Sequence, residues 1–249
     1  MARKLSQIII RAQGLRKDHA RGSTITQALR GVDLEIARGE FVSIMGPSGS
    51  GKTTLFNAIG ALDTPTAGTV FIDEVDVAQL NADELAYIRC KKIGYIFQSY
   101  NLVTVQTCLE NVITPMIFAG LITDRAIKRG MELLTLVGLA DRWDHRPKEM
   151  SGGQQQRTAI ARALANDPSI LLCDEPTANL DLKTGQEIND LLVRLQKERG
   201  ATVICSTHDH RMLNVSDRVM WLRDGRIERV SKRQDLTISL GQVEVEGHP

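Results

Sequence analysis

A run of glycines and serines that ends in a lysine and two threonines carries the clearest chemical signal in this sequence. It fits the pattern G-x-x-x-x-G-K-[ST], in which glycines let the backbone curl so that successive N–H groups face a phosphate. The run follows an apolar stretch, Phe41–Met45, and opens a predicted helix, Lys52–Ala61, whose N-terminal dipole adds to the attraction. The predicted phosphate-binding loop comprises Gly46, Pro47, Ser48, Gly49, Ser50, Gly51, Lys52, Thr53 and Thr54.

Three side chains of this loop have predicted roles. Lys52 is expected to reach the β- and γ-phosphates of a nucleotide, the hydroxyl of Thr53 to ligate Mg²⁺, and Thr54 to contact the α-phosphate. The alternative is a glycine- and serine-rich turn that happens to precede a lysine. The strand before the loop and the helix after it are the context that the motif requires, so they favour phosphate binding.

Two adjacent carboxylates end a second apolar stretch. Asp174 and Glu175 follow Ile170–Cys173, and ligands of open α/β sheets bind at the carboxyl ends of the strands. We expect Asp174 to hold Mg²⁺ through water, and Glu175 to polarise a water that attacks the γ-phosphate. Such a pair alone is equally typical of a solvated strand end. Together with the phosphate loop, it indicates nucleotide hydrolysis.

Short apolar runs alternate with amphipathic stretches along the chain, and this alternation predicts an α/β fold with a mostly parallel sheet. The predicted helices are Lys52–Ala61, Asp124–Val137, Gly153–Ala165 and Leu182–Glu198. The predicted strands are Gln7–Ala12, Val32–Ile36, Phe41–Met45, Thr69–Ile72, Ile93–Phe97, Ile170–Cys173, Thr202–Cys205, Val219–Leu222 and Ile227–Val230. Continuous apolar runs such as Thr202–Cys205 suit strands that are covered on both faces.

The pattern also predicts how the chain is divided. Strand signals give way to helical ones between Ser99 and about Leu164, whereas the segment before Glu40 suits a small antiparallel sheet. We therefore predict a single domain over 1–249. Its α/β core with a β subdomain takes about 1–98 and 166–230, a helical subdomain about 99–165, and a C-terminal tail 231–249. The last residues, from Gln242 on, are polar and are predicted to fray.

Composition excludes several classes of protein. The chain has 249 residues, of which 42% are hydrophobic and 24% charged, so it is neither disordered nor a collagen-like or coiled-coil rod. Lys and Arg number 31 and Asp and Glu 30, which gives a net charge of +1 and no basic footprint for nucleic acid.

Neither a membrane span nor a disulfide framework is predicted. The longest apolar run, Val112–Ile122, is broken by Thr114, Pro115 and Gly120, and falls short of the roughly 20 residues that cross a bilayer. The four cysteines form no C-x-x-C pair, which fits a reducing compartment. We therefore expect a soluble chain that is not exported.

Further stretches resemble the ATP-binding-cassette (ABC) ATPases, in the order typical of that family. Met150–Arg157 is similar to the signature motif, and Asn179–Asp181 to the D-loop. Gln98 follows a predicted strand as the Q-loop glutamine does, and His208 follows another as the switch histidine does. The motifs extend from Phe41 to about Arg226, which is nearly the whole chain.

The resemblance implies a P-loop NTPase core with a mostly parallel sheet, a small antiparallel β subdomain and an inserted helical subdomain. It implies ATP and Mg²⁺ as cofactors. Catalysis is assigned by it to Glu175, His208, Lys52 and Gln98. Nucleotide binding is assigned to the phosphate loop together with His19, Gln98, Ser151, Gly152, Gly153 and Asp181, and Mg²⁺ binding to Thr53, Gln98 and Asp174.

The signature stretch has its own physical logic. Ser151 is a plausible N-cap for the helix that follows, and Gly152 and Gly153 would let a phosphate approach the backbone. A plain helix cap is the alternative for this motif taken alone.

One position departs from the family pattern. ABC ATPases usually stack adenine on an aromatic residue, often Tyr, after the first strand, and aligning Gly14–Asp18 on that segment puts His19 there. An imidazole offers less stacking area than a phenol ring. Either His19 stacks on the base, or another group holds it.

Within the family, the chain resembles the lipoprotein-release and macrolide-export type, through Gly94–Gln98, Glu110–Val112, Asp174–Asp181 and Leu62–Gly68. That type implies a head-to-tail dimer of cassettes around two ATP molecules, which drives a separate permease from the cytoplasmic face of the membrane. Residues Ser99–Leu102 are then expected to contact the permease.

A soluble ABC ATPase acting on nucleic acid or ribosomes is the competing interpretation. DNA-repair members carry a long coiled coil between the phosphate loop and the signature, whereas Thr53–Ser151 holds no sustained heptads. Translation factors carry two cassettes, and this chain has one phosphate loop. A GTPase would need an N-K-x-D motif, which is absent. The transporter ATPase is therefore favoured, with no nucleic-acid partner.

Overall fold

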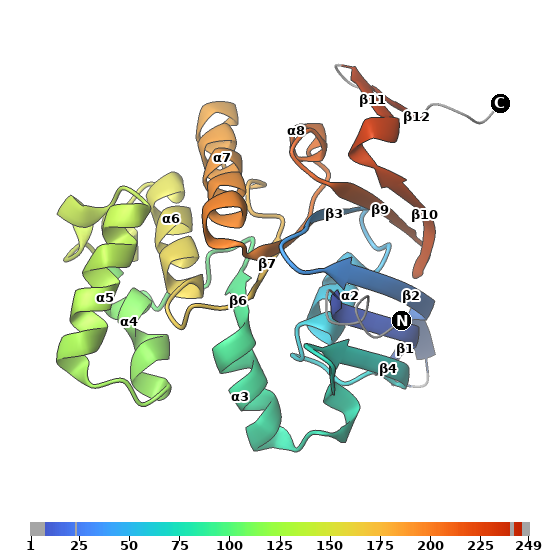
Figure 1. The fold of residues 1–249 in the computed structure, drawn as a ribbon, viewed down its shortest axis with the longest axis horizontal. Helices are drawn as coiled ribbons and strands as arrows, with labels where there is room; N and C mark the ends of the chain where they lie inside the picture. The colour runs from blue at the N-terminus through green and yellow to red at the C-terminus, as the bar shows by residue number, and fades with distance from the viewer. Residues whose placement is uncertain (1–7, 23, 240–241, 246–249) are drawn as a thin grey trace. The chain divides into compact units, whose positions relative to one another are not determined.

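The computed structural model describes residues 8–22, 24–239 and 242–245, and the chain divides into two compact units (Figure 1). The first unit comprises Met1–Ala86 and Thr202–Pro249, and the second comprises Tyr87–Ala201. The boundary falls within helix α3 (Ala82–Lys92). Both units combine strands with helices, so the predicted α/β class is confirmed. The subdomain boundaries proposed from the sequence stay predictions.

An antiparallel sheet forms the first part of the first unit. Its strands lie in the order β2-β1-β4-β5, with bounds Ile8–Arg21 for β1, Thr24–Ala37 for β2, Ala67–Ile72 for β4 and Val75–Asp76 for β5. The predicted small antiparallel sheet is therefore confirmed. Strands β1 and β2 are much longer than predicted because their pairing continues through polar segments, with several register shifts. Gln7, where the first strand was expected to begin, lies outside the described residues.

A second sheet of this unit carries the buried core strand. Its order is β10-β9-β3-β8, with bounds Phe41–Met45 for β3, Thr202–Ser206 for β8, Arg218–Arg223 for β9 and Arg226–Lys232 for β10. Strand β3 runs parallel to both β8 and β9, and every residue of β3 and β8 is buried. The continuous apolar runs are thus strands covered on both faces, as predicted.

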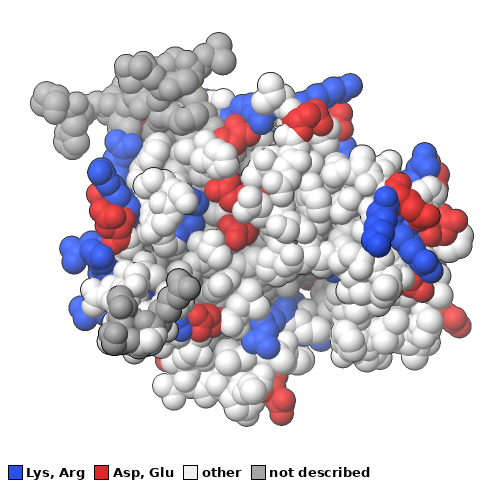
Figure 2. Space-filling model, turned by 180° about the vertical axis from the view of Figure 1, so that it is seen from behind, with Lys and Arg blue, Asp and Glu red and all other residues white. Residues whose placement is uncertain are grey.

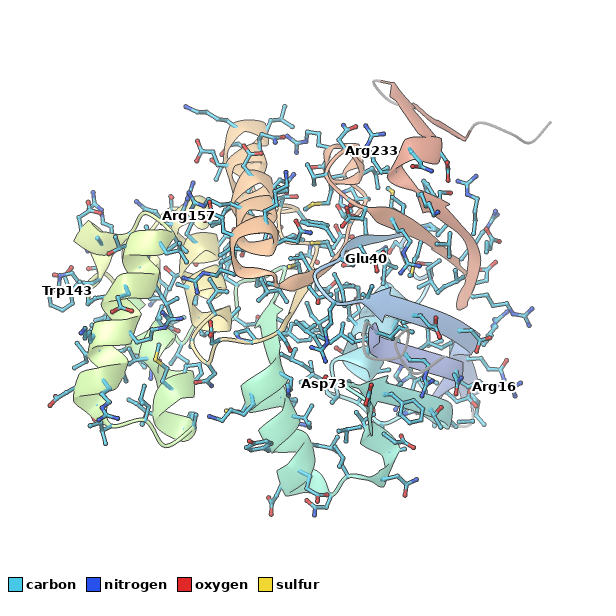
Figure 3. The ribbon with its side chains drawn as sticks, viewed as in Figure 1. Arg16, Glu40, Asp73, Trp143, Arg157 and Arg233 are labelled. Atoms are coloured by element: carbon cyan, nitrogen blue, oxygen red, sulfur yellow. The ribbon has the colours of Figure 1, made fainter. Side chains whose placement is uncertain are left out.

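Ionic contacts fix the start of β3. The carboxylate of Glu40, which is labelled in Figure 3, accepts hydrogen bonds from the guanidinium of Arg218 on β9. Asp217 accepts a hydrogen bond from the N–H of Phe41 at 2.8 Å. Helix α2 (Lys52–Ile59) follows β3 and buries Leu55, Phe56, Ala58 and Ile59 against strands of the same unit.

The second unit is mainly helical around a parallel strand pair, β6 (Ile93–Ile96) and β7 (Ile170–Asp174). Between these two strands lie α4 (Cys108–Phe118), α5 (Thr123–Leu136) and α6 (Gly152–Ala163), which pack side by side (Figure 1). No strand lies in this fully described stretch, as the sequence pattern predicted.

Helix α7 (Leu182–Arg199) packs on α6 within the same unit. The guanidinium of Arg157 donates to Glu187 of α7 at 2.8 Å and to the carbonyl oxygen of Val137 at 3.1 Å (Figure 3). A single side chain of α6 therefore ties this helix to two neighbouring segments.

Several elements were not predicted. Helix α3 buries only Ile88, so it lacks an apolar stripe; it is stabilised at its start by Asn81, whose side chain accepts from two main-chain N–H groups. Helix α8 (His210–Leu213) is short. The prediction that the tail frays is wrong for Gln242–Val245, which forms strand β12 paired with β11 (Leu236–Ser239). Single 3-10 turns cover Val77–Gln79, Ala140–Arg142, Pro147–Glu149 and Arg233–Asp235.

None of the helices in the described residues is long and apolar enough to cross a membrane. Cys108, Cys173 and Cys205 are buried, and Cys90 is half-buried; all four are free thiols. Cys173 lies on β7 and Cys205 on β8, so both belong to buried strands.

Two buried asparagines of the second unit differ sharply in their hydrogen bonding. Asn111 of α4 accepts from the N–H of Val103 at 2.8 Å and donates to the carbonyl oxygens of Val103, Gln106 and Thr107. It therefore ties the loop before α4 to that helix. Asn189 of α7 is also fully buried, but its side-chain nitrogen and oxygen have no hydrogen-bond partner among the described residues.

This difference predicts opposite effects of the same substitution. Asn111→Leu should lower the free energy of unfolding by about 2–3 kcal/mol, because several buried main-chain groups lose their partner. Asn189→Leu should leave it within about 1 kcal/mol of wild type, or raise it, because it removes polar atoms that are buried unpaired. Urea unfolding followed by circular dichroism measures both. An Asn189→Leu cost as large as that of Asn111→Leu would show that Asn189 is hydrogen-bonded after all.

Candidate functional site

The loop between β3 and α2 has a form that requires glycine at two positions. Gly51, the N-cap of α2, has a φ of +104°, and a Cβ there would lie 2.6 Å from the carbonyl oxygen of Ala28. A Cβ on Gly46 would lie 2.1 Å from the carbonyl oxygen of Leu222. Both distances are far inside van der Waals contact, so the loop curls this tightly only because neither residue has a side chain.

The start of α2 suits an anion. No side chain caps this helix and its first turn holds no acidic residue, so main-chain N–H groups and the helix dipole present positive charge. Lys52 Nζ donates to the carbonyl oxygens of Gly46 at 2.7 Å and Pro47 at 3.2 Å. The buried Oγ of Ser50 has no hydrogen-bond partner among the described residues. Donors and positive charge therefore converge on this turn, which fits a phosphate group.

Two predicted histidines also belong to the first unit. His19 is exposed on β1, and its Nε2 lies 3.5 Å from Oγ1 of Thr54 in α2, so the structure brings His19 to the phosphate loop. His208 is exposed and follows β8.

A carboxylate follows His208 directly. Burial alone would raise the pKa of Asp209, but hydrogen bonds from Arg211 outweigh this and hold the pKa below its usual range. The same carboxylate caps α8 by accepting from the N–H of Arg211 at 2.9 Å. His208 therefore lies next to a carboxylate whose ionised form is stabilised by Arg211.

In the second unit, the predicted acid pair ends strand β7. Asp174 is the last residue of the strand, and Glu175 adopts a left-handed backbone conformation with a φ of +47°. A glutamate in that region is uncommon and costs on the order of 1 kcal/mol. This left-handed conformation turns the chain sharply just after the strand. Burial, with a smaller contribution from Asp174, raises the pKa of Tyr95 on β6 well above its usual range, so this phenol stays neutral.

The segment after β6 is held by side chains from α6 and from the loop between β7 and α7 in the same unit. Gln98 is exposed, and its carbonyl oxygen accepts from Nδ2 of Asn179 at 3.0 Å. Tyr100 and Asn101 both have left-handed backbone conformations. Arg162 of α6 donates to the carbonyl oxygens of both, at 2.7 Å in the case of Tyr100. Gln98 and the predicted D-loop residue Asn179 are thus brought together.

Sequence reasoning missed Arg162. Its signal was a charged residue inside an otherwise apolar helical stretch, Ala159–Ala165, where a structural partner is the usual reason for an arginine.

The signature stretch begins α6, as predicted. Ser151 is the N-cap: its Oγ accepts from the N–H of Gln154 at 3.3 Å, and the Gln154 side chain accepts from the N–H of Ser151 at 2.9 Å. This reciprocal pair is a capping box. The Ser151 hydroxyl uses an acceptor lone pair in it, so its proton remains available to donate.

The two signature glycines are required by packing within the unit. A Cβ on Gly152 would lie 2.9 Å from the hydroxyl oxygen of Tyr100, and a Cβ on Gly153 would lie 2.4 Å from Cγ2 of Thr184 on α7. The sequence suggested that these glycines open the backbone to a phosphate. The structure adds that each also makes room for a neighbouring side chain.

Asp181 caps the neighbouring helix α7. Its Oδ1 accepts from the N–H groups of Lys183 at 3.1 Å and Thr184 at 3.0 Å. Hydrogen bonds from the side chain and backbone of Thr184 lower the pKa of Asp181. The carboxylate therefore stays ionised and fixes the start of α7.

The predicted site residues thus fall into two sets. His19, the phosphate loop and His208 lie in the first unit; Gln98, Ser151–Gly153, Asp174, Glu175 and Asp181 lie in the second. The described residues contain no cluster of three His, Cys, Asp or Glu that could hold a metal. The predicted Mg²⁺ ligands are instead a hydroxyl, an amide and a carboxylate oxygen. That chemistry suits Mg²⁺, which binds few protein oxygens and completes its shell with water and phosphate.

Comparisons with known proteins agree with the motifs. A family profile described as "ABC transporter" matches residues 29–178. An uncharacterised ABC transporter ATP-binding protein of Thermotoga maritima is 51% identical, over 85% of this chain and 90% of that protein. A similar protein of Methanocaldococcus jannaschii, MJ0796, is 48% identical over 90% of this chain and 97% of its own length.

A longer relative contains a cassette as one part. The macrolide export ATP-binding/permease protein MacB of Brucella melitensis is 46% identical over 92% of this chain, which spans 35% of that protein.

Solved structures confirm the fold. A dimeric structure of MJ0796 has a TM-score of 0.85 and 47% identity, covering 90% of this chain and 99% of that chain. A dimeric post-hydrolysis state of MJ0796 bound to ADP and Pi has the same TM-score, with 46% identity and the same coverage. The family resemblance and the cassette fold inferred from the motifs are therefore confirmed.

The contact between Gly153 and Thr184 predicts a rescue. Gly153→Ala should lower the free energy of unfolding by about 1–3 kcal/mol, because the new methyl group overlaps Cγ2 of Thr184. Thr184→Ser deletes that Cγ2 and keeps the hydroxyl, so the double variant Gly153→Ala/Thr184→Ser should recover most of the loss. Thermal unfolding of the two single variants and the double variant measures it. A double variant no more stable than Gly153→Ala would contradict the packing role.

Proposed function

The chain belongs to the ABC transporter family as an ATP-binding subunit that hydrolyses ATP, and we propose that two copies close head to tail on two ATP molecules to drive a separate membrane permease. The observation that carries this proposal is the tight glycine-containing loop of residues 46–51, which Lys52 contacts, in a chain that also carries one signature helix. The similar MJ0796 cassettes are described as dimeric, which supports the pairing.

The first unit binds the nucleotide. N–H groups of the phosphate loop and the ammonium of Lys52 hold the β- and γ-phosphates, and Thr54 contacts the α-phosphate. His19, which lies beside Thr54, stacks on adenine with the modest area of an imidazole. The unpartnered hydroxyl of Ser50 provides a further donor at the turn.

Mg²⁺ would accompany the nucleotide, held by the side-chain oxygens of Thr53 and Gln98 and, through water, by Asp174. When bound, it neutralises charge on the β- and γ-phosphates. Asp174 carries the negative charge of this set, and Tyr95 stays neutral beside it. A single carboxylate with a hydroxyl and an amide leaves room for phosphate oxygens and water in the shell.

The second unit, with His208 of the first, carries the hydrolytic groups. Glu175 accepts the proton of the attacking water as a general base, and its left-handed backbone turns the chain directly after strand β7. Gln98 and His208 orient that water and the γ-phosphate. Gln98 is well suited because its main chain is held by Asn179.

The signature of each copy completes the site of the other copy. The Ser151 hydroxyl donates a hydrogen bond to the γ-phosphate, while Gly152 and Gly153 present main-chain N–H groups at the start of α6. Asp181 holds the start of α7, which packs against Gly153 through Thr184, and so orders this surface.

The permease contacts the second unit, and the complex lies at the cytoplasmic face of the membrane. A hollow of about 420 Å³ opens among α3, β6, α4 and α6; its lining includes Phe97, Phe118 and Arg162. Phe118 is 85% exposed, which is unusual for a phenyl ring without a partner surface. The neighbouring residues Ser99–Leu102 join this contact. MacB proteins, whose names couple an ATP-binding part to a permease, support a transmembrane partner.

A role on nucleic acid has no comparable support. On the face shown in Figure 2, basic and acidic side chains are interspersed rather than gathered into one basic field. The net charge of +1 is consistent with that distribution.

The general-base role predicts a separation of binding from turnover. Glu175→Gln should retain ATP affinity and lose about 10²–10⁴ in hydrolysis rate, because an amide keeps the size of the side chain but cannot accept the proton. Steady-state phosphate release and nucleotide titration measure the two properties. Glu198→Gln, an exposed acid of α7 outside the site, is the matched control and should stay near wild type. Turnover of Glu175→Gln within threefold of wild type would remove this residue from the role.

The shared site predicts a nucleotide-dependent dimer. Glu175→Gln should dimerise in ATP and Mg²⁺ and be monomeric without them, because unhydrolysed ATP holds the two copies together. Adding Ser151→Arg should abolish the dimer by placing a bulky cation at the phosphate contact, whereas adding Thr135→Arg on α5 should not. Light scattering distinguishes the states. A monomer in saturating ATP without either added substitution would contradict the homodimer.

A further inference from the structure

Arg162 is a half-buried arginine held by neutral partners. It lies on α6, about three turns after Ser151, and burial lowers its pKa. Its hydrogen bonds go to the carbonyl oxygens of Tyr100 and Asn101. Burying a guanidinium against carbonyl groups is costly, because carbonyl groups do not neutralise it. The position therefore calls for an explanation beyond general stability.

Arg162 binds a stretch of backbone whose conformation is rarely adopted by residues other than glycine. Tyr100 has a φ of +60° and Asn101 a φ of +50°, so two consecutive non-glycine residues are left-handed. A tyrosine in this region is an outlier, and such residues persist only where their surroundings hold them. Local turn hydrogen bonds run from Tyr100 N to Phe97 O at 3.2 Å and from Asn101 N to Ser99 O at 2.6 Å, and neither uses the carbonyl oxygens of Tyr100 and Asn101.

Side chains from two elements thus fasten three carbonyl groups of one short segment. Asn179 holds the carbonyl oxygen of Gln98, and Arg162 holds those of Tyr100 and Asn101. The Tyr100 hydroxyl in turn lies where Gly152 leaves space at the start of α6. The segment that carries Gln98 is therefore bonded to the signature helix near its end, through Arg162, and lies next to its start, through the Tyr100 side chain.

From these contacts we propose that Arg162 is a positioning residue for ATP hydrolysis: it fixes the segment after Gln98 relative to the helix that Ser151 begins. The inference rests on the proposed roles of Gln98 and the signature. It adds that the two are linked through one guanidinium, so that Gln98 reaches its working position only while Arg162 holds Tyr100 and Asn101.

The same guanidinium also lines the hollow described above. The lining of the hollow also includes Phe97, which directly precedes Gln98 in the chain, while Arg162 donates to the carbonyl oxygen of Tyr100, two residues after Gln98. Arg162 therefore contacts both this hollow and the segment that follows Gln98.

Replacing Arg162 separates positioning from binding. In the full chain, Arg162→Ala should lower kcat by about tenfold or more and leave the KM for ATP within about twofold, because the phosphate loop lies in the other unit and keeps its contacts. Arg162→Lys keeps the charge and donates to one carbonyl, so its kcat should be intermediate. Arg194→Ala removes another guanidinium–carbonyl contact of this unit, to Leu136 at 3.0 Å, and should leave both constants near wild type.

Hydrogen exchange provides a second readout that needs no turnover. In Arg162→Ala, amides of residues 98–103 should exchange at least about tenfold faster than in wild type, while those of α7 stay protected. The same result is expected in Arg162→Lys, to a smaller extent, which covers the case that the alanine variant folds poorly. If exchange is faster in Arg162→Ala but the wild-type protein does not hydrolyse ATP, the contact between Arg162 and residues 98–103 is retained. The proposed function is then rejected instead.

Two results would overturn the positioning role. One is an Arg162→Ala protein whose kcat stays within about twofold of wild type. The other is unchanged exchange over residues 98–103 in both Arg162 variants, which would show that the segment keeps its conformation without the guanidinium.

Discussion

A phosphate group can be bound by consecutive main-chain N–H groups only where the chain turns more tightly than side chains permit, and the first unit is built around that constraint. Strand β3 is buried between two parallel neighbours and cannot shift. The chain must then reverse into α2 while passing the carbonyl groups of Leu222 and Ala28, which leaves room for no Cβ at Gly46 or Gly51. The contacts of Glu40 and Asp217 at the start of β3 hold the strand to which this turn is attached.

The second unit meets a different requirement, since its reactive groups are side chains that must be aimed. For each of them, the adjacent main chain is held in a defined conformation. Glu175 is aimed by a left-handed turn, Gln98 by the hold of Asn179 on its carbonyl, and Ser151 by a capping box. The left-handed conformation of Glu175 places strain at a position where function needs a defined geometry.

Much of this could be predicted because the relevant signals are local. Buried strands read as continuous apolar runs, the phosphate loop has a fixed spacing, and Ser151 and Gln154 form a cap within four residues. What was missed depends on distant contacts. The long pairing of β1 with β2 and the hairpin at Gln242–Val245 follow from main-chain hydrogen bonds that composition does not reveal. Helix α3 has caps but no apolar stripe, and the partners of Arg162 lie about sixty residues away along the chain.

A shared site is tested most directly by mixing two inactive proteins. Lys52→Ala removes the ammonium at the phosphate loop, and Ser151→Arg blocks the signature, so each homodimer lacks both sites. A mixed dimer pairs the intact loop of one chain with the intact signature of the other, which restores one site. An equal mixture should therefore regain a measurable part of wild-type turnover, since only the mixed dimer contains an intact site. A mixture as inactive as its components would contradict the shared site.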